Sequence, residues 1–290
     1  MGVSSLVMEL RTLRYFVAVA EELHFGRAAA RLHMSQPPLS RAIKQLEADV
    51  GAVLLHRSAA GVALTPAGAV LLDEARILLG RADRVRERVA AEAGAASITV
   101  GILADSADRG TTRLAAAYRR RHPGVEVRVR ETGLTDPTCG LRAGLVDVAL
   151  TLGPFDETGL TVRELRVDPV GAVLRADDPL ARRDRLELAD LAGRRWFRFP
   201  DGTDPVWRSY WSGGEAREGP VVRAVQECVQ AVLWNGTVGM APLGHALPEE
   251  LAVVPLVDMA PTRVVAVWKE GDTNPLIRSF VRIASAVYRD

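Results

Sequence analysis

The sequence predicts an α+β protein of several domains, with a small helical domain, one long helix and a larger α/β domain in chain order. Short amphipathic segments fill the first 50 residues, one uninterrupted helical repeat follows residue 65, and strand and helix patterns alternate from residue 97 onward. A chain of 290 residues is long enough for two or three hydrophobic cores. We therefore expect domains at 1–65, 66–95 and 96–290.

The composition is that of an ordinary globular protein. Hydrophobic residues make up 48% and charged residues 25% of the chain, and the formal net charge is +1, so any face that binds nucleic acid has to be locally basic. Cys139 and Cys228 lack the spacing of a metal site, which predicts buried thiols in a reducing compartment. No segment has the pattern of a membrane span or an export signal, so we expect a cytoplasmic protein without membrane contact.

The N-terminal residues show the apolar spacing of three helices. One apolar face runs along Glu9–Glu22, and small apolar residues mark a shorter helix over Arg27–Leu32. Ser35 is positioned as the N-cap of a third helix, and Gly51 is positioned to end it. The apolar stripe of this third helix consists of Leu39, Ile43, Leu46 and Val50.

The second and third helices, joined by a tight turn, have the pattern of a helix-turn-helix, whose later helix enters the major groove of DNA. The polar face of the third helix supplies hydrogen-bonding groups for base edges and cations for phosphates. Its members are Gln36, Pro37, Ser40, Arg41 and Lys44. The spacing alone fits equally well a three-helix bundle with a solvated polar face.

A short hairpin of the kind that forms a wing favours the DNA-binding interpretation. Two short segments, Leu54–Arg57 and Val62–Leu64, flank a turn over Ser58–Gly61, and Arg57 lies beside that turn. The pair Thr65-Pro66 then forms a strong helix start. Together these features predict a winged helix-turn-helix.

A long helix is predicted from about Pro66 to Glu92. Apolar residues follow alternating steps of four and three along it, as in a coiled-coil seam, and its flanks are charged. The seam consists of Leu71, Ala75, Leu78, Ala82, Val85 and Val89. A helix packed along its own domain is the alternative, but the length and the charged flanks favour a homodimer. Two copies would present two recognition helices to a palindromic operator.

The remaining residues alternate between strand and helix patterns, as in parallel βαβ units of a small-molecule sensor. We expect strands at Ile98–Leu103, Val125–Val129, Val148–Leu152, Val170–Leu174, Arg195–Phe199, Val238–Ala241 and Arg263–Val267. We expect helices at Thr112–His122, Thr138–Gly144, Val225–Trp234 and Pro275–Val287.

Ligands of open parallel sheets bind beyond the carboxyl ends of the strands, beside helix N-termini that favour anions. The loops at that edge are expected at 104–110, 132–137, 153–154 and 200–204. Their polar groups come from Asp105, Ser106, Thr132, Thr135, Arg198 and Thr203. Each of these residues taken singly also fits a solvated loop position or a helix cap.

Catalytic and metal-binding patterns are lacking in the sequence. It contains no phosphate-binding glycine loop, zinc-protease motif or serine-hydrolase elbow, and the five histidines are not in ligand spacing with one another. We therefore expect no enzyme activity, no metal and no cofactor other than a small-molecule inducer.

The N-terminal pattern resembles that of LysR-type transcription regulators. The resemblance extends more loosely to Gly101, Pro123, Leu141–Asp147 and Gly236–Pro242. The residues that carry it are Leu13–Phe16, Ala28, Ala29, Leu32, Ser35, Gln36, Leu39, Ser40, Ile43, Leu46, Glu47, Gly51, Leu55, Arg57 and Leu64–Gly68.

The resemblance implies a winged helix-turn-helix, a dimerising linker helix and two α/β subdomains similar to those of periplasmic binding proteins. Subdomain one would comprise about 97–165 and 265–290, and subdomain two about 166–264. Such regulators form homodimers or homotetramers and bind double-stranded promoter palindromes. They respond to an inducer held between the subdomains, and RNA polymerase is a further expected partner.

Carried onto this chain, the resemblance assigns specific residues to each site. DNA contact falls to Arg27, Ser35, Gln36, Pro37, Ser40, Arg41, Lys44 and Arg57. The inducer cleft would be lined by Asp105, Ser106, Thr132, Thr135, Arg198, Phe199 and Pro200. Asp105 argues against a carboxylate inducer and Arg198 argues for one, so the class of the inducer stays open.

One departure from the family concerns the wing. The family commonly places a phenylalanine before the wing arginine and a second arginine in the turn, whereas this chain has His56 and then Ala59-Ala60-Gly61. We therefore expect a weaker grip on phosphate.

Two other classes of protein compete with the regulator. A periplasmic solute-binding protein would need an export signal and would leave the first ninety residues without a use. An enzyme with an appended DNA-binding domain would need a catalytic constellation in the cleft.

Overall fold

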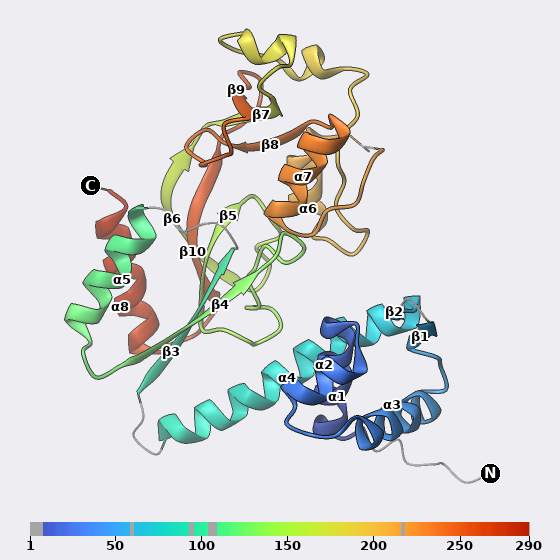
Figure 1. Ribbon diagram of the computed structural model, residues 1–290. Helices are drawn as coiled ribbons and strands as arrows, with labels where there is room; N and C mark the ends of the chain where they lie inside the picture. Colours follow the sequence, from blue (N-terminus) through green and yellow to red (C-terminus); the bar gives the residue numbers. More distant parts are fainter. Residues whose placement is uncertain (1–7, 59–60, 93–95, 104–108, 216–217, 290) are drawn as a thin grey trace. The chain divides into compact units, whose positions relative to one another are not determined.

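The computed structural model describes residues 8–58, 61–92, 96–103, 109–215 and 218–289. The chain divides into two compact units, Met1–Glu92 and Ala93–Asp290, and each has a hydrophobic core of its own (Figure 1). Within the described residues, no helix combines the length and the apolar character needed to cross a membrane.

The first unit is built around three short helices whose apolar faces meet. Phe16 of the first helix and Leu39, Ile43 and Leu46 of the third are buried, as the spacing predicts. Gly51 ends the third helix with a φ of 70°, a left-handed conformation that suits glycine. The elements are α1 (Leu10–Glu22), α2 (Phe25–Arg31), α3 (Gln36–Val50), β1 (Leu55–Ser58), β2 (Gly61–Leu64) and α4 (Pro66–Glu92).

One helix start and one predicted capping hydrogen bond differ from the expectation. α2 begins at Phe25, because His24 Nδ1 accepts hydrogen bonds from the amides of Gly26 and Arg27 at 3.0 and 3.2 Å. Ser35 occupies the N-cap position of α3, but its side chain makes no capping hydrogen bond. The hydroxyl of Ser35 is therefore not used to start the helix.

The wing is joined directly to the C-terminal half of α3. The carboxylate oxygen Oε1 of Glu47 accepts hydrogen bonds from the amides of Leu54 and Leu55 at 2.9 and 3.2 Å. β1 then pairs with β2 in antiparallel register, with Leu55 opposite Leu64. A side chain of α3 thus fixes where the hairpin of β1 and β2 begins.

Thr65 joins the wing to α4. Its hydroxyl accepts a hydrogen bond from the amide of Gly68 at 2.9 Å and donates one to the carbonyl of Val53 at 2.7 Å. A Cβ atom on Gly68 would lie 2.0 Å from the carbonyl oxygen of Leu54, so this close approach requires glycine. The predicted helix start is confirmed.

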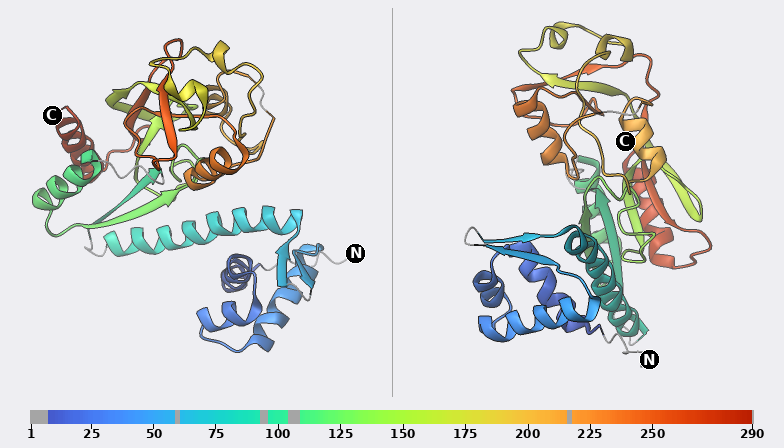
Figure 2. Two further views of the ribbon diagram at one scale, coloured as in Figure 1. Left: turned by 45° about the horizontal axis from the view of Figure 1, so that its top comes forward. Right: turned by 90° about the vertical axis from the view of Figure 1, so that its right-hand side faces the viewer.

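α4 is a single continuous helix of 27 residues (Figure 2), and its two halves have different surroundings. Ala75 is fully buried and Leu72 nearly so, where α4 packs on the core of its own unit. Leu78, Val85 and Val89 are 41%, 60% and 65% exposed. The predicted seam therefore starts inside the unit's own core, and its later members Leu78, Val85 and Val89 are exposed whereas Ala82 is half-buried.

A five-stranded sheet with the strand order β4-β3-β5-β10-β6 forms one part of the second unit. β3 runs parallel to both β4 and β5, as predicted, but β10 is antiparallel to β5 and β6, so the sheet is mixed. Helices α5 and α8 lie side by side (Figure 1), with the rings of Tyr118 and Phe280 5.5 Å apart. The bounds are β3 (Ser97–Leu103), α5 (Arg109–Arg121), β4 (Glu126–Thr132), β5 (Val148–Gly153), β6 (Leu160–Asp168), β10 (Thr262–Lys269) and α8 (Pro275–Val287).

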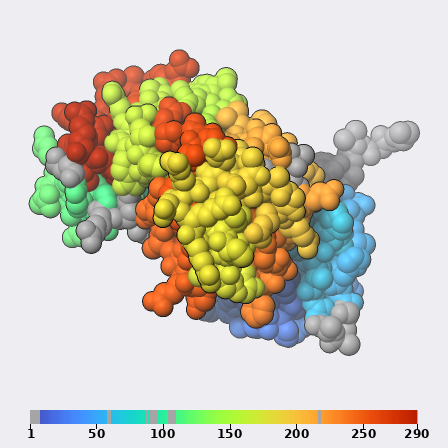
Figure 3. All heavy atoms as spheres, turned by 90° about the horizontal axis from the view of Figure 1, so that it is seen from above, coloured from blue at the N-terminus to red at the C-terminus, as the bar shows by residue number. Residues whose placement is uncertain are grey.

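The other part of the second unit contains a three-stranded antiparallel sheet of order β8-β7-β9. Figure 3 shows the segment that carries its two 3-10 helices, in yellow, at the surface. The bounds are β7 (Val170–Arg175), η1 (Pro179–Arg182), η2 (Leu188–Leu191), α6 (Pro205–Trp211), α7 (Val225–Asn235), β8 (Gly239–Pro242) and β9 (Leu251–Pro255).

The helix predicted at Thr138–Gly144 is wrong, because this segment forms consecutive turns. The carboxylate of Asp136 accepts hydrogen bonds from the amides of Thr138 and Gly140 at 3.0 and 2.6 Å. Cys139 has a φ of 52°, which a right-handed helix does not allow. A side-chain acceptor therefore replaces the helical hydrogen bonds.

The strand predicted at Arg195–Phe199 is also wrong. The segment makes isolated bridges, Trp196 with Val238 and Arg198 with Val221, and joins neither sheet.

The elements β6, β9 and α6 were not predicted from the sequence. β6 lies at the sheet edge, where the exposed charged residues Arg163 and Glu164 obscure its apolar alternation. β6 and β10 extend about three residues beyond the bounds expected for subdomain one.

The bond between Glu47 and the wing should make a measurable contribution to stability. We expect Glu47→Ala to lower the free energy of unfolding of the first unit by about 1 to 3 kcal/mol, because two amides lose their acceptor. Glu47→Gln keeps an acceptor oxygen and should lose less than half of that. Hydrogen exchange of the buried amides of α3 measures both values, and equal losses in the two variants would contradict the assignment.

Candidate functional site

The exposed face of α3 gathers polar side chains on the side opposite the buried stripe. Ser35, Gln36 and Pro37 are exposed at its N-terminal end, and Arg41 and Lys44 are exposed one and two turns further on. Among the residues that the structure describes, Arg41 and Lys44 have no acidic partner. Both cations are therefore available to an anionic ligand.

Arg57 connects the wing to both helices of the helix-turn-helix. Its Nη1 donates a hydrogen bond to Ser40 Oγ at 3.0 Å. Its guanidinium carbon lies 4.3 Å from the centre of the Phe25 ring, a cation–π arrangement. The wing strand β1 is thereby held against α2 and α3.

Arg27 is directed elsewhere. Its guanidinium donates a hydrogen bond to the carbonyl of Glu22, and its Nε lies 3.4 Å from the carboxylate of the same residue. The structure therefore brings six of the predicted residues together on or beside α3 and joins Arg57 to them. Arg27 instead binds the C-terminal end of α1.

The two cysteines do not form a reactive site. Burial raises the pKa of the Cys139 thiol and of the Cys228 thiol to about 12. A protonated thiol is a poor nucleophile and a poor metal ligand. No group of three His, Cys, Asp or Glu side chains capable of holding a metal occurs in the part of the chain that the structure describes.

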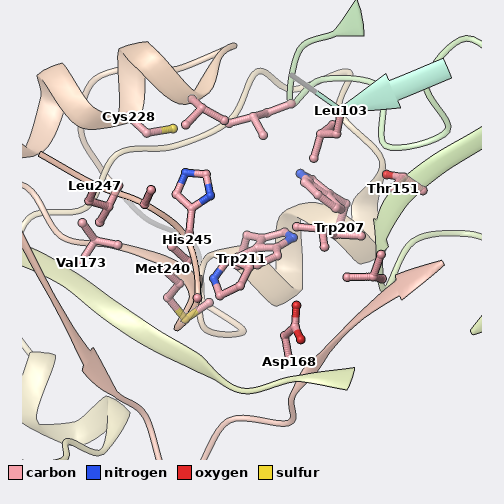
Figure 4. Close-up of a pocket in the computed structure, with 18 of the residues that line it drawn as sticks. Leu103, Thr151, Asp168, Val173, Trp207, Trp211, Cys228, Met240, His245 and Leu247 are labelled. Carbon is pink, nitrogen blue, oxygen red and sulfur yellow. The ribbon is translucent and has the colours of Figure 1, made fainter. Parts of the chain in front are cut away.

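The second unit contains a cavity of about 850 Å³ (Figure 4). Its lining comes from strands of both sheets, from helices α5, α6 and α7, from the loop after β8 and from Tyr288 at the end of α8. Leu103, Leu150 and Val264 represent the five-stranded sheet, and Val173 and Met240 represent the three-stranded sheet. The volume lies within the range of small-molecule sites.

Four aromatic side chains form a large part of the lining. The rings of Phe197 and Phe199 lie 6.1 Å apart edge to face, and those of Trp207 and Trp211 lie 5.4 Å apart. Both indoles are almost completely buried, and Figure 4 shows them beside the open centre of the cavity, with His245 and Cys228 around the same space. The cavity surface is therefore predominantly apolar.

Helix α6 is held in place from both ends. The carboxylate of Asp204 accepts hydrogen bonds from the amides of Trp207 and Asp156 at 2.9 and 3.0 Å. The hydroxyl of Tyr210 donates to the carbonyl of Ala260 at 2.5 Å. These bonds fix the position of the two indoles.

Few of the residues expected to line an inducer cleft line this cavity. Phe199 lines the cavity, whereas Thr132, Thr135, Arg198 and Pro200 lie outside its lining. The hydroxyl of Thr132 donates a hydrogen bond to the carbonyl of Ile102 instead. The Nη1 atom of Arg198 lies 3.7 Å from Oδ1 of Asp201, with which it forms an ion pair. The other two expected residues, Asp105 and Ser106, lie outside the described residues.

Sequence reasoning missed Trp207 and Trp211. Their signal was present, because the pair Asp204-Pro205 is a helix start and the two indoles follow with the i, i+4 spacing of one helical face.

Two family models match the chain. One is described as the bacterial regulatory helix-turn-helix protein, lysR family, and matches residues 10–69. The other is the LysR substrate binding domain and matches residues 91–289.

Curated relatives include three transcription regulators. The Hca operon transcriptional activator HcaR of Escherichia coli is 32% identical, over 95% of this chain and 97% of its own length. ClcR of Pseudomonas putida is 30% identical, over 95% and 98%. AlsR of Bacillus subtilis is 36% identical, but the match spans 63% of this chain and 62% of AlsR.

Solved structures of similar architecture include CbnR, a LysR family transcriptional regulator, with 25% identity and a TM-score of 0.59 over 98% of this chain and 100% of that one. Full-length CbnR complexed with its target DNA has 26% identity and a TM-score of 0.51, over 97% and 100%. Full-length BenM has 26% identity and a TM-score of 0.55, over 97% of each chain.

The contacts of Arg57 predict how the wing responds to substitution. We expect both Arg57→Ala and Arg57→Lys to speed hydrogen exchange of the β1 amides, because lysine lacks the flat group that covers Phe25 and reaches Ser40. His56→Ala, on the same strand and exposed, serves as the control and should change little. Exchange in Arg57→Lys as slow as in the unsubstituted protein would show that charge alone suffices.

Proposed function

Because the chain belongs to the LysR family of bacterial helix-turn-helix regulators, we propose that it is a cytoplasmic transcription regulator that binds a promoter palindrome and responds to a small-molecule inducer. The exposed face of α3 carries this proposal. It combines hydrogen-bonding groups for bases with two cations that no described acid neutralises, beside a wing that Arg57 holds in place.

In this proposal the residues at the DNA interface have different tasks. Gln36 and Ser35, at the end of α3 that enters the groove, meet base edges, and Arg41 and Lys44 meet bases or phosphates. Arg57 contacts phosphate from the wing while Ser40 supports it. Arg27, which is bound to Glu22, contributes positive potential rather than a base contact.

Dimerisation is proposed along the exposed part of α4. Leu78, Val85 and Val89 form an apolar stripe that a second copy would cover, with Ala82 between them. Leu71 and Ala75, part of the same predicted seam, support the helix from within its own unit. A homodimer or homotetramer that presents two copies of α3 fits a palindromic operator and would act on RNA polymerase.

The inducer site is proposed to be the cavity between the two sheets. This cavity would then lie between subdomain one and subdomain two. Its lining belongs to elements of both sheets, so a bound molecule would alter how they pack. The domain limits that accompany this proposal are 1–65 for DNA binding, 66–95 for the linker helix and 96–290 for inducer binding.

The experiment that tests the function is fluorescence anisotropy with the purified protein and two DNA fragments across a salt series. One fragment lies upstream of the protein's own gene, and the other is unrelated. Preferential binding to the first that persists at higher salt supports a specific regulator. Equal binding to both, with the full salt dependence of phosphate contacts, contradicts it.

Arg41→Ala should weaken operator binding by about 1 to 3 kcal/mol if the side chain binds a base, and should flatten the salt slope if it binds a phosphate. The same anisotropy titrations distinguish the two results. Gln45→Ala, at an exposed position one turn further along α3, is the matched control, because it shortens a polar side chain without removing a charge. No change in affinity or slope for Arg41→Ala would remove Arg41 from the interface.

Leu78→Asp should break the dimer, because a carboxylate in an apolar seam loses its hydration without gaining a partner. Val70→Asp introduces the same charge at an exposed position of the same helix outside the seam, and should leave the dimer intact. Analytical ultracentrifugation of both variants measures the effect. A Leu78→Asp protein that sediments like the unsubstituted one would rule out this seam.

A further inference from the structure

We propose that the cavity binds an uncharged, planar molecule of two or more fused rings, held through a carbonyl or ether oxygen by the indole N–H groups of Trp207 and Trp211. This inference rests on the proposed function, since it takes the cavity to be the inducer site. It names the chemical class of the inducer.

The size and the aromatic surface of the cavity favour a ligand of several rings. Its volume of about 850 Å³ is several times the roughly 150 Å³ of a cavity that holds one benzene ring. Phe197, Phe199, Trp207 and Trp211 supply flat surfaces, which favour stacking or edge contacts with another ring. A ligand of several rings can cover more of this surface than a small acid can.

The charged groups of the lining favour an uncharged ligand. Among its described residues, the acidic and guanidinium groups are Asp168 and Arg166, and these bind each other through two hydrogen bonds of 2.7 and 2.8 Å. The cation is therefore already neutralised. A carboxylate ligand would have to displace Asp168 in order to pair with the Arg166 guanidinium.

The hydroxyl groups of the lining are also engaged within the protein. Thr151 donates to the carbonyl of Pro137 at 2.7 Å, and Thr111 and Tyr288 bond each other at 3.2 Å. A sugar or another polyol would find few of the partners that its hydroxyls require.

Two indole N–H groups of the lining have no partner in the part of the chain that the structure describes. The Nε1 atoms of Trp207 and Trp211 are buried and have no hydrogen-bond partner among the described residues, and the two residues are only 1% and 6% exposed. Buried N–H groups are rarely left unsatisfied in native proteins. An indole can donate but not accept, so the complementary atom on the ligand is an acceptor. Together with the apolar lining, this defines a polycyclic ligand that carries one or two oxygen acceptors.

Isothermal titration calorimetry of the full-length protein with three matched probes tests the inference. The probes are 9-fluorenone, which has a carbonyl acceptor, fluorene, which has the same rings without it, and fluorene-2-carboxylate, which is charged. Each is titrated into the unsubstituted protein and into Trp207→Phe, Trp211→Phe and Trp234→Phe. Phenylalanine keeps an aromatic ring and removes the N–H, and Trp234, 81% exposed and outside the cavity lining, is the control.

We expect fluorenone to bind more tightly than the other two probes. Trp207→Phe or Trp211→Phe should weaken fluorenone binding about five- to tenfold, the effect of losing one hydrogen bond, and leave fluorene binding within about twofold. Trp234→Phe should change neither. Because a misfolded variant would lose fluorene as well, fluorene binding reports on the integrity of the cavity.

Three results would overturn the inference: tighter binding of the carboxylate than of fluorenone, no binding of any probe, or equal losses for fluorenone and fluorene in the Trp207 and Trp211 variants.

Operator binding by the same preparations is measured separately. If it is specific while the probes fail, the regulator function stands and the inducer class is wrong. If operator binding also fails, the proposed function fails with it.

Discussion

The burial of one apolar stripe on α3 is the constraint on which the first unit depends. With Leu39, Ile43 and Leu46 directed into the core, the helical repeat leaves Arg41 and Lys44 exposed on the other side. Two further contacts hold the wing against α3. The Glu47 carboxylate accepts a hydrogen bond from the amide of Leu54, and the Arg57 guanidinium on β1 donates one to Ser40. The face proposed to meet DNA is thus positioned by the same packing that stabilises the unit.

Local signals at several helix ends allowed correct prediction. The Thr65-Pro66 start, the Gly51 stop and the limits of α8 depend on residues within a few positions of each other, and all agree with the structure. The turns after Asp136 did not follow, because they depend on a side-chain acceptor that helical spacing ignores. The antiparallel course of β10 did not follow either, since strand direction is set by distant pairing.

The cavity of the second unit shows the same limit. The rule that ligands bind beyond strand ends identifies an edge of a sheet, but it does not say which side chains turn inward. Thr132 ends β4 and Arg198 precedes α6, and both bond elsewhere. Trp207 and Trp211 come from helix α6 and line the cavity. Polar residues were chosen as candidates, whereas the lining is mainly aromatic and aliphatic.

The continuity of α4 has a mechanical consequence. Its 27 residues pass through Gly80 without a break, and at about 1.5 Å per residue they form a rod of about 40 Å. A helix of this kind resists bending far more than a flexible tether does. In a dimer joined along this rod, the distance between the two recognition helices would be nearly constant. Operators with a changed spacer length between their half-sites would therefore fit poorly.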